Sequence, residues 1–340
     1  MPRLLIQVRY FLIFFVVTAN LWEQAASESA LIAYLYEWIY LFHIPLFVLV
    51  TGYFAGKESF LKLSFIILFP YVVFQSVYCL LDVVFFHMHE GAYSFFIPYS
   101  FLWFLFSHFF WRLLLAAVIR YRFPFVLAIC TSCLIGMVPD TGGWFSLQKM
   151  IYFFPFYLLG AQLASNVGAG KTMSRVLAFL REKPPIWLRW ILFLLISVLF
   201  LTVTEVAWLS GQWNYEQLGL SIGSGVFMRV AMYGIQLLTG VCLIAIVRGQ
   251  SDFLHDSGKQ TFFVYLLHAS VVKTILALQL LQPLSPVMMA WMVPAAAWLL
   301  VWLLSRPQVK RSLHYVVEPG WLFQLGLKWR HGDEAKPRGV

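Results

Sequence analysis

Charged residues are scarce in this sequence. Asp, Glu, Lys and Arg make up 11% of its 340 residues, whereas hydrophobic residues make up 61%. The mean hydropathy is +0.79. So few charged side chains cannot cover the surface of a water-soluble globule, which excludes an ordinary soluble fold. The composition therefore predicts an integral membrane protein.

Cysteine is rarer still, and the four cysteines all lie inside apolar runs, so no exported disulfide framework is expected. Cys130 and Cys133 have C-x-x-C spacing without a second pair, which is typical of small packing residues. Residues 168–172 resemble a phosphate-binding loop, but Ser165 stands where that motif requires its first glycine. We therefore expect neither a metal site nor a resident cofactor.

Apolar runs recur along the chain, which contains no short-period repeat and no low-complexity linker. A helix that crosses a bilayer needs about 17–25 residues. Suitable runs lie at residues 4–22, 32–54, 63–86, 99–118, 123–139, 149–165, 187–208, 223–247, 261–282 and 287–305. The predicted fold class is all-α. It is a polytopic bundle of about ten transmembrane helices over residues 1–306, followed by a basic tail over residues 307–340.

The distribution of Lys and Arg predicts the orientation. If both termini are cytoplasmic, most of the 24 Lys and Arg residues fall in cytoplasmic loops and in the tail. The opposite loops, at residues 23–31, 87–98, 140–148, 209–222 and 283–286, contain none. Lys and Arg resist translocation, so this pattern favours both termini inside. The net charge of +9 then reflects topology and affinity for anionic lipid, and we expect no nucleic-acid partner.

One run, LFHIPLFVLVTGY at residues 41–53, places His43 and Pro45 among side chains that favour lipid. An ionisable group at membrane depth is costly and is a functional candidate by default. Tyr40 and Phe47 share a helical face with His43, at spacings of three and four residues. A buried histidine that only holds helices together by hydrogen bonding is the alternative interpretation.

Polar residues also mark two depths of the first span. Arg9 and Asn20 share one helical face and are separated by about 16 Å along the axis. Arg9 is thus expected toward the cytoplasm and Asn20 toward the outside. These side chains either line a polar route or form interhelical hydrogen bonds.

Other spans carry similar polar positions. Asp82 lies near the end of the third span, and Arg229 in the outer third of the eighth. Tyr265 and His268 share a face of the ninth span, and interhelical hydrogen bonding is again the alternative role. Arg112 is expected to be an anchor, because its side chain can extend to the inner interface.

Five aromatic strings resemble motifs of one family. They are FHIPLFVLVTGYF at 42–54, FPY at 69–71, LWFL at 102–105, FFPFYLLG at 153–160 and TFFVYLLH at 261–268. In residue sequence, order and position they resemble the motifs of membrane acyltransferases of acyltransferase family 3, in the branch of fucose 4-O-acetylases. The resemblance extends along most of the predicted membrane domain.

The resemblance implies O-acyl transfer. The acyl group, usually acetyl, moves from cytoplasmic acyl-CoA to a hydroxyl of an envelope glycan or lipid-linked glycan. It also implies a multi-pass protein of the bacterial cytoplasmic membrane. Acyl-CoA is then a donor substrate rather than a bound cofactor.

Candidate binding residues follow from this hypothesis. Basic side chains on the cytoplasmic side suit the phosphates of acyl-CoA, unless they only set the orientation; these are Lys57, Lys62, Arg120 and Arg122. Polar and aromatic side chains within the spans are candidates for substrate binding; these are Arg9, Tyr40, Asp82, Lys149, Arg229 and Tyr265.

The chain departs from the family pattern at the end of the first span. The family has a histidine there, thought to act as the base on the acceptor hydroxyl, and this chain has Asn20. An amide cannot accept a proton at neutral pH and can only position or donate. Lys149 replaces an arginine and loses its bidentate geometry. Thr51 replaces a serine and keeps the hydroxyl.

Three accounts of this departure remain open. In the first, His43 or His268 is the base, with His108 a weaker candidate, and Asn20 polarises the acceptor or the thioester carbonyl. In the second, the protein binds glycan or acyl-CoA without turnover. In the third, the helices transport a polar or lipid-linked solute.

Overall fold

The computed structural model describes residues 2–56, 59–86, 94–165, 185–201, 206–247 and 252–317. Every regular element in these ranges is helical, and no strand occurs within them, which confirms the all-α prediction. Lys57 and the part of the predicted tail at 318–340 lie outside the described residues.

Six helical segments of the described chain are long and apolar enough to cross a membrane. They are Pro2–Trp22, Ala30–Tyr53, Phe60–Phe85, Ser100–Val118, Ile222–Val247 and Pro286–Leu304. Shorter apolar helices or helical stretches cover Pro124–Ile135, Ile186–Leu195 and Thr261–Ala277. These segments support an integral multi-pass membrane protein.

The helices named below have the following bounds. The first group is α1 (Pro2–Trp22), α2 (Ala30–Tyr40), α3 (His43–Tyr53), α4 (Phe60–Leu63), η2 (Ser64–Leu68), α5 (Phe69–Leu81) and η3 (Asp82–Phe86). The second is α6 (Trp103–Val118), α7 (Pro124–Ile135), α8 (Leu147–Ser165), α10 (Ile186–Leu201) and α12 (Ile222–Val247). The last is α13 (Asp252–Gly258), α14 (Thr261–Ala277), α15 (Pro286–Leu304) and α16 (Pro307–Val317).

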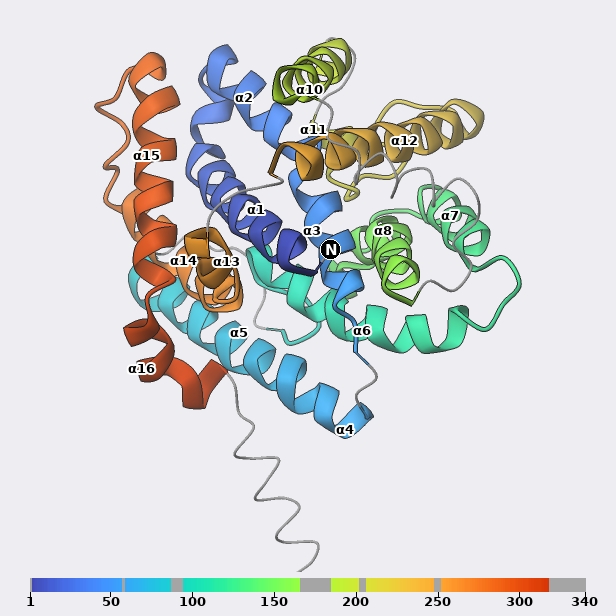
Figure 1. Ribbon diagram of the computed structural model, residues 1–340, viewed down its shortest axis with the longest axis horizontal. Helices are drawn as coiled ribbons and strands as arrows, with labels where there is room; N and C mark the ends of the chain where they lie inside the picture. Colours follow the sequence, from blue (N-terminus) through green and yellow to red (C-terminus); the bar gives the residue numbers. More distant parts are fainter. Residues whose placement is uncertain are drawn as a thin grey trace, which may run out of the picture.

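The helices form one bundle around α1 and α3. Figure 1 shows α15 at one edge and α7 at the opposite edge, with α1 and α3 between them. α1 packs against α13, α14 and α15, and α3 packs against α8. α3 and α8 approach closely at two glycines that lack a side chain. A Cβ added at Gly52 would clash with the Tyr157 carbonyl, and one at Gly160 with the Leu49 carbonyl.

The predicted second span is broken into α2 and α3. α2 ends at Tyr40 and α3 begins at His43, so Pro45 lies in the first turn of a new helix, where its missing N–H costs little. At the break, Nδ1 of His43 lies 2.7 Å from the carbonyl oxygen of Ile39. The side chain thus satisfies a carbonyl at a position where the regular helix is interrupted.

A π-helical turn, η2, precedes α5. The N–H of Phe69 bonds to the carbonyl of Ser64, five residues earlier. Pro70, which lacks an N–H and would crowd the carbonyl four residues before it, explains the wider turn. The turn contributes Ile66 and Ile67 to the wall of a cavity described below.

Two cavities separated by an aromatic partition

The first cavity has a volume of about 260 Å³ and is enclosed by α1, α3, α4, η2, α6 and α14. We call it the Arg9 cavity. Its polar wall consists of Arg9, Thr51, His108, Arg112 and Thr261. Its apolar wall consists of Phe47, Phe54, Leu63, Ile66, Ile67, Phe104, Leu105, Phe262 and Tyr265.

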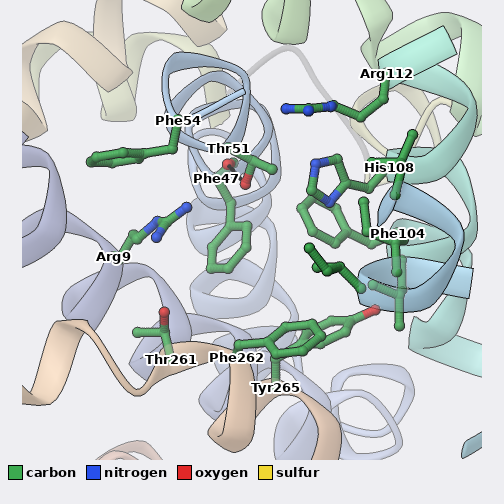
Figure 2. A pocket seen from close by; sticks show the side chains of 14 residues that line it. Arg9, Phe47, Thr51, Phe54, Phe104, His108, Arg112, Thr261, Phe262 and Tyr265 are labelled. Atoms are coloured by element: carbon green, nitrogen blue, oxygen red, sulfur yellow. Dashed lines mark hydrogen bonds between the residues drawn. The ribbon is translucent and has the colours of Figure 1, made fainter. Parts of the chain in front are cut away.

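The charged groups of the Arg9 cavity are all of one sign. Figure 2 shows Arg9 on one side and His108 and Arg112 on the other, with Thr51 between them. The guanidinium of Arg9 lies 4.4 Å from the centre of the Phe54 ring. None of the described residues that line this cavity is acidic. Two guanidiniums in an apolar enclosure favour an anionic ligand, particularly one with phosphate or carboxylate oxygens.

The second cavity has a volume of about 290 Å³ and mixed polarity. We call it the Asn20 cavity. Its polar wall consists of Asn20, Glu23, Tyr40, His43, Ser100 and Lys149. Its remaining wall consists of Val16, Ile44, Phe47, Phe101, Trp103, Phe104 and Tyr265. A hydroxyl-rich ligand would find both donors and acceptors here.

His43 has one ring nitrogen bound and one available. Nδ1 faces the carbonyl oxygen of Ile39 at 2.7 Å, and a carbonyl can only accept, so Nδ1 carries the proton. The neutral ring then has its lone pair on Nε2. Within the described part of the chain, the ring makes no second hydrogen bond, and it meets Tyr40 edge-on with ring centres 4.8 Å apart. His43 therefore presents a basic nitrogen in the wall of the Asn20 cavity.

Asn20 is held by His268. The Nδ2 atom of Asn20 lies 3.0 Å from Nε2 of His268. Nδ1 of His268 faces the carbonyl oxygens of Tyr265 at 2.7 Å and Val264 at 3.1 Å, so Nδ1 carries the proton and Nε2 accepts. This arrangement fixes the amide with Nδ2 toward the ring. Its other N–H and its carbonyl oxygen remain for the cavity.

Three aromatic side chains line both cavities: Phe47, Phe104 and Tyr265. The rings of Phe47 and Phe104 pack edge-on with their centres 5.1 Å apart, and those of Phe104 and Tyr265 pack edge-on with their centres 5.7 Å apart. The Tyr265 hydroxyl donates to the carbonyl of Phe101 at 2.7 Å. We call these three side chains the aromatic partition, since they separate the cavity with the arginines from the cavity with His43.

A third cavity, of about 330 Å³, continues from the Asn20 cavity and shares Ser100, Trp103 and Lys149 with it. We call it the loop cavity. Its other walls come from loop segments and the start of α8: Ile97, Pro98, Asp140, Gly142, Gly143, Ser146, Gln148 and Gln212. Lys149 lies with its Nζ 5.5 Å from the centre of the Trp103 ring, at the boundary between the two cavities.

Two predicted site residues lie away from these cavities. Arg229 is buried, donates to the carbonyls of Ser132 at 2.6 Å and Trp213 at 3.4 Å, and stacks on Tyr215 at 4.9 Å. Burial raises the pKa of Tyr215, so its hydroxyl stays protonated and donates to a backbone carbonyl at 2.9 Å. This geometry suits a clamp between the 209–222 loop and α7.

Asp82, the other such residue, is buried at the start of η3 and accepts a hydrogen bond from the Tyr99 hydroxyl at 3.2 Å. The ammonium of Lys273 lies 4.9 Å from the centre of the Tyr99 ring. Asp82 therefore belongs to a polar cluster that ties η3 to α14, and it lines neither of the two main cavities.

Three of the four predicted donor-binding residues lie on the protein surface. Lys62, Arg120 and Arg122 are exposed, and none of the three lines the Arg9 cavity. Lys62 does adjoin Leu63 in the cavity wall, and Arg120 follows the end of α6, the helix that carries His108 and Arg112. Lys57 lies outside the described residues.

Two charged residues of the Arg9 and Asn20 cavities were not among the predicted binding residues. Arg112 was predicted to be an interfacial anchor, and the structure places its side chain in the wall of the Arg9 cavity. Glu23 lies one residue beyond α1 and lines the Asn20 cavity. Their spacing in the sequence could have indicated both. His108 and Arg112 are four residues apart, and Asn20 and Glu23 are three apart, so each pair shares a helical face.

The described residues contain no group of three His, Cys, Asp or Glu side chains that could hold a metal ion. No family model, curated protein or solved structure matches this chain.

Proposed function

We propose that this protein is a membrane O-acyltransferase that uses a cytoplasmic acyl-CoA, with acetyl-CoA the expected donor, to acylate a hydroxyl of a cell-envelope glycan. One observation carries the proposal. A cationic, largely apolar cavity and a polar cavity with a basic histidine nitrogen share a wall of three side chains. Such an arrangement allows an anionic donor and a hydroxylic acceptor to approach one reaction point from opposite sides.

The proposed topology has ten spans with both termini in the cytoplasm. The absence of Lys and Arg from the opposite loops supports it. In this orientation the Arg9 cavity is on the cytoplasmic side and the loop cavity on the outer side. The three cavities then follow one another across the membrane in the order required for a cytoplasmic donor and an external acceptor.

In the donor site, Arg9 and Arg112 bind phosphate or other anionic groups of acyl-CoA, and the apolar wall accommodates the pantetheine arm and the acyl group. Guanidiniums in an apolar enclosure interact more strongly with anions than exposed ones do. The exposed residues Lys62, Arg120 and Arg122 attract the polyanion to this face. Lys57 carries the same charge in the same loop region.

In the chemical step, His43 is the general base. Its Nε2 takes the proton from the acceptor hydroxyl as the oxygen attacks the thioester carbonyl. A C–O bond forms and the C–S bond breaks. The proton then passes from His43 to the departing thiolate, which leaves as free CoA. No further reactant is needed.

Asn20 supports this step as a hydrogen-bond donor rather than as the base. One N–H of its amide is bound to His268, and the second can stabilise the negative charge that develops on the thioester carbonyl oxygen. His268 is then a positioning residue, since both of its ring nitrogens are occupied. Tyr40, Glu23 and Lys149 supply polar groups for the acceptor.

Transfer can be tested in membranes from cells with and without the gene. Inverted vesicles are supplied with radiolabelled acetyl-CoA, and label released from the glycan fraction by mild alkali is measured. We expect ester-linked label only where the protein is present, and its loss in His43→Ala. The matched control is His314→Ala, since His314 is exposed on α16. Equal labelling with and without the gene would contradict the proposal.

The series of three cavities also favours a second candidate, the passage of a polar or lipid-linked anion. The two functions differ in what happens to acyl-CoA. A transporter or a non-catalytic binding protein would leave the thioester intact, whereas an acyltransferase releases one free thiol per ester formed. Measurement of thiol release in the vesicle assay separates them.

A further inference from the structure

We propose that Phe47, Phe104 and Tyr265 form the passage between the donor and acceptor sites and limit the transferred acyl group to a short chain. This inference rests on the proposed acyltransferase function and adds a determinant of donor specificity. It concerns the three residues of the aromatic partition.

The position of the partition follows from three helices. Phe47 comes from α3, Phe104 from α6 and Tyr265 from α14. On α3, His43 lines the Asn20 cavity one turn before Phe47, and Thr51 lines the Arg9 cavity one turn after it. Phe47 thus lies at the level where one cavity ends and the next begins. Figure 2 shows Phe47, Phe104 and Tyr265 as part of the Arg9 cavity wall.

The partition is braced rather than open. The edge-on contacts of Phe104 with Phe47 and with Tyr265 bring all three rings together, and edge-on aromatic pairs are favourable beyond the burial of their surface. The centre of the Phe104 ring also lies 5.7 Å from that of Trp111, and the Tyr265 hydroxyl donates to the carbonyl of Phe101, two residues before α6. The size of the passage is therefore set by side chains with little freedom to move.

The geometry of a thioester donor makes this passage selective. The nucleotide end of acyl-CoA stays with the cations of the Arg9 cavity, so the acyl end enters first. For the carbonyl carbon to meet a hydroxyl activated by His43, the carbons beyond the carbonyl must fit between the three rings and the acceptor on the far side of the partition. An acetyl group places one methyl there, whereas a hexanoyl chain needs space that the rings occupy.

The first test compares donors of two lengths. The ratio of kcat/KM for hexanoyl-CoA to that for acetyl-CoA is measured in Phe47→Ala and Phe104→Ala, and in Phe262→Ala as the matched control. Phe262 lines only the Arg9 cavity. We expect the ratio to rise by about 10–200-fold in the two partition variants, a range typical of hydrophobic size selection. An unchanged ratio in both, or an equal rise in Phe262→Ala, would overturn the proposal.

The second test needs no turnover. In a background without Cys79, Cys130, Cys133 and Cys242, Val16→Cys places a thiol in the wall of the Asn20 cavity. A membrane-impermeant methanethiosulfonate reagent is applied separately to each face of sealed vesicles. From the face on which the loop cavity lies, we expect labelling regardless of Phe47. From the face on which the Arg9 cavity lies, we expect labelling that is slow in the wild type, several-fold faster in Phe47→Ala and still slow in Phe262→Ala.

The two tests separate the passage from the function. Slow labelling from one face that Phe47→Ala relieves, without ester formation by any variant, would support the partition and contradict the acyltransferase. Labelling that is equally fast from both faces with Phe47 present would overturn the partition, whatever the activity. Size-exclusion profiles in detergent establish that each variant is folded before either result is interpreted.

Discussion

The amide of Asn20 donates a hydrogen bond from Nδ2 to Nε2 of His268, over 3.0 Å. Since Nδ1 of His268 faces backbone carbonyls, the neutral ring can accept only at Nε2, and the amide cannot turn over without losing the bond. Asn20 reaches the cavity and His268 lies behind it. The side chain of Asn20 therefore has a defined orientation, with Nδ2 as the donor to His268.

The roles of the two histidines predict different losses. His43→Ala removes the proposed base, and we expect turnover to fall by about 10²–10⁴-fold. The rate should also decline as the pH is lowered, because a protonated Nε2 has no lone pair to offer. Turnover by the wild-type protein and His43→Ala is compared across pH in the vesicle assay. A near-normal rate in His43→Ala would contradict this assignment.

Substitution of His268 should act through Asn20. In His268→Ala the amide loses its partner, and we expect kcat to fall by up to about 10²-fold, since misplacement of a reacting or positioning group by about 1 Å has effects of that size. The shape of the pH–rate profile should stay that of the wild type. A profile that loses its low-pH decline would instead make His268 the base.

Asn20 itself distinguishes a working donor from a lost base. Asn20→Ala should lower turnover by about 10²–10³-fold, as expected for the loss of one oxyanion donor. Asn20→His should not restore that donor geometry, because two imidazoles would then face each other. A large gain of turnover in Asn20→His, measured in the same assay, would mean that the native chain is a weakened enzyme with its base removed.

Donor binding should depend more on the half-buried cations of the Arg9 cavity than on exposed ones. Arg112→Gln should raise the KM for acyl-CoA at least about tenfold, because a guanidinium in an apolar enclosure is weakly screened. The Arg120→Gln/Arg122→Gln pair should raise it less, and its effect should shrink at high ionic strength, since exposed charges are screened over about 8 Å at physiological salt. KM is measured at two salt concentrations for each protein. An unaltered KM in both the Arg112 variant and the double variant would contradict donor binding and leave these residues only a role in setting the topology.

Much of the fold was predictable because a helix that crosses the bilayer needs about 20 consecutive apolar residues. Long apolar runs at 4–22 and 223–247 correspond closely to α1 and α12. The ends were less predictable where the chain leaves the regular helix early. α7 ends at Ile135 rather than at residue 139, and α14 at Ala277 rather than at 282.

The site was less predictable, because hydropathy does not say which helical faces meet. His43 was identified as a candidate from its cost in lipid, and the structure places it in a polar cavity. The pairing of Asn20 with His268 joins positions 248 residues apart. Arg112 shows the same limit, since an arginine near the end of a span can reach either the interface or a cavity.

The proposed topology has a direct test. A reporter active only in the cytoplasm is fused after Lys62, Arg122, Arg189, Lys259 or the tail, and we expect activity at all five positions. Fusions at Gly91 and Gln212 should be inactive, because they fall in loops without Lys or Arg. Consistent activity at Gly91 or Gln212 would refute the ten-span arrangement.

The close approach of α3 and α8 predicts a strong dependence on two glycines. Because a Cβ at Gly160 would meet the Leu49 carbonyl, Gly160→Ala must push the two helices apart. Overpacking of this kind costs about 1–3 kcal/mol or more, and backbone atoms cannot move aside as side chains do. Gly52→Ala should behave alike, since its Cβ would meet the Tyr157 carbonyl.

Gly234→Ala is the matched control, because a Cβ there meets no atom within 4 Å and alanine is the better helix former by about 1 kcal/mol. Thermal unfolding of the detergent-solubilised proteins provides the measurement. We expect lower midpoints for Gly52→Ala and Gly160→Ala, and an unchanged or higher midpoint for Gly234→Ala. Because α3 carries His43, Phe47 and Thr51, a shift of α3 against α8 should also disturb both cavities. Unchanged midpoints in both α3–α8 variants would show that these helices do not pack as closely as the structure has them.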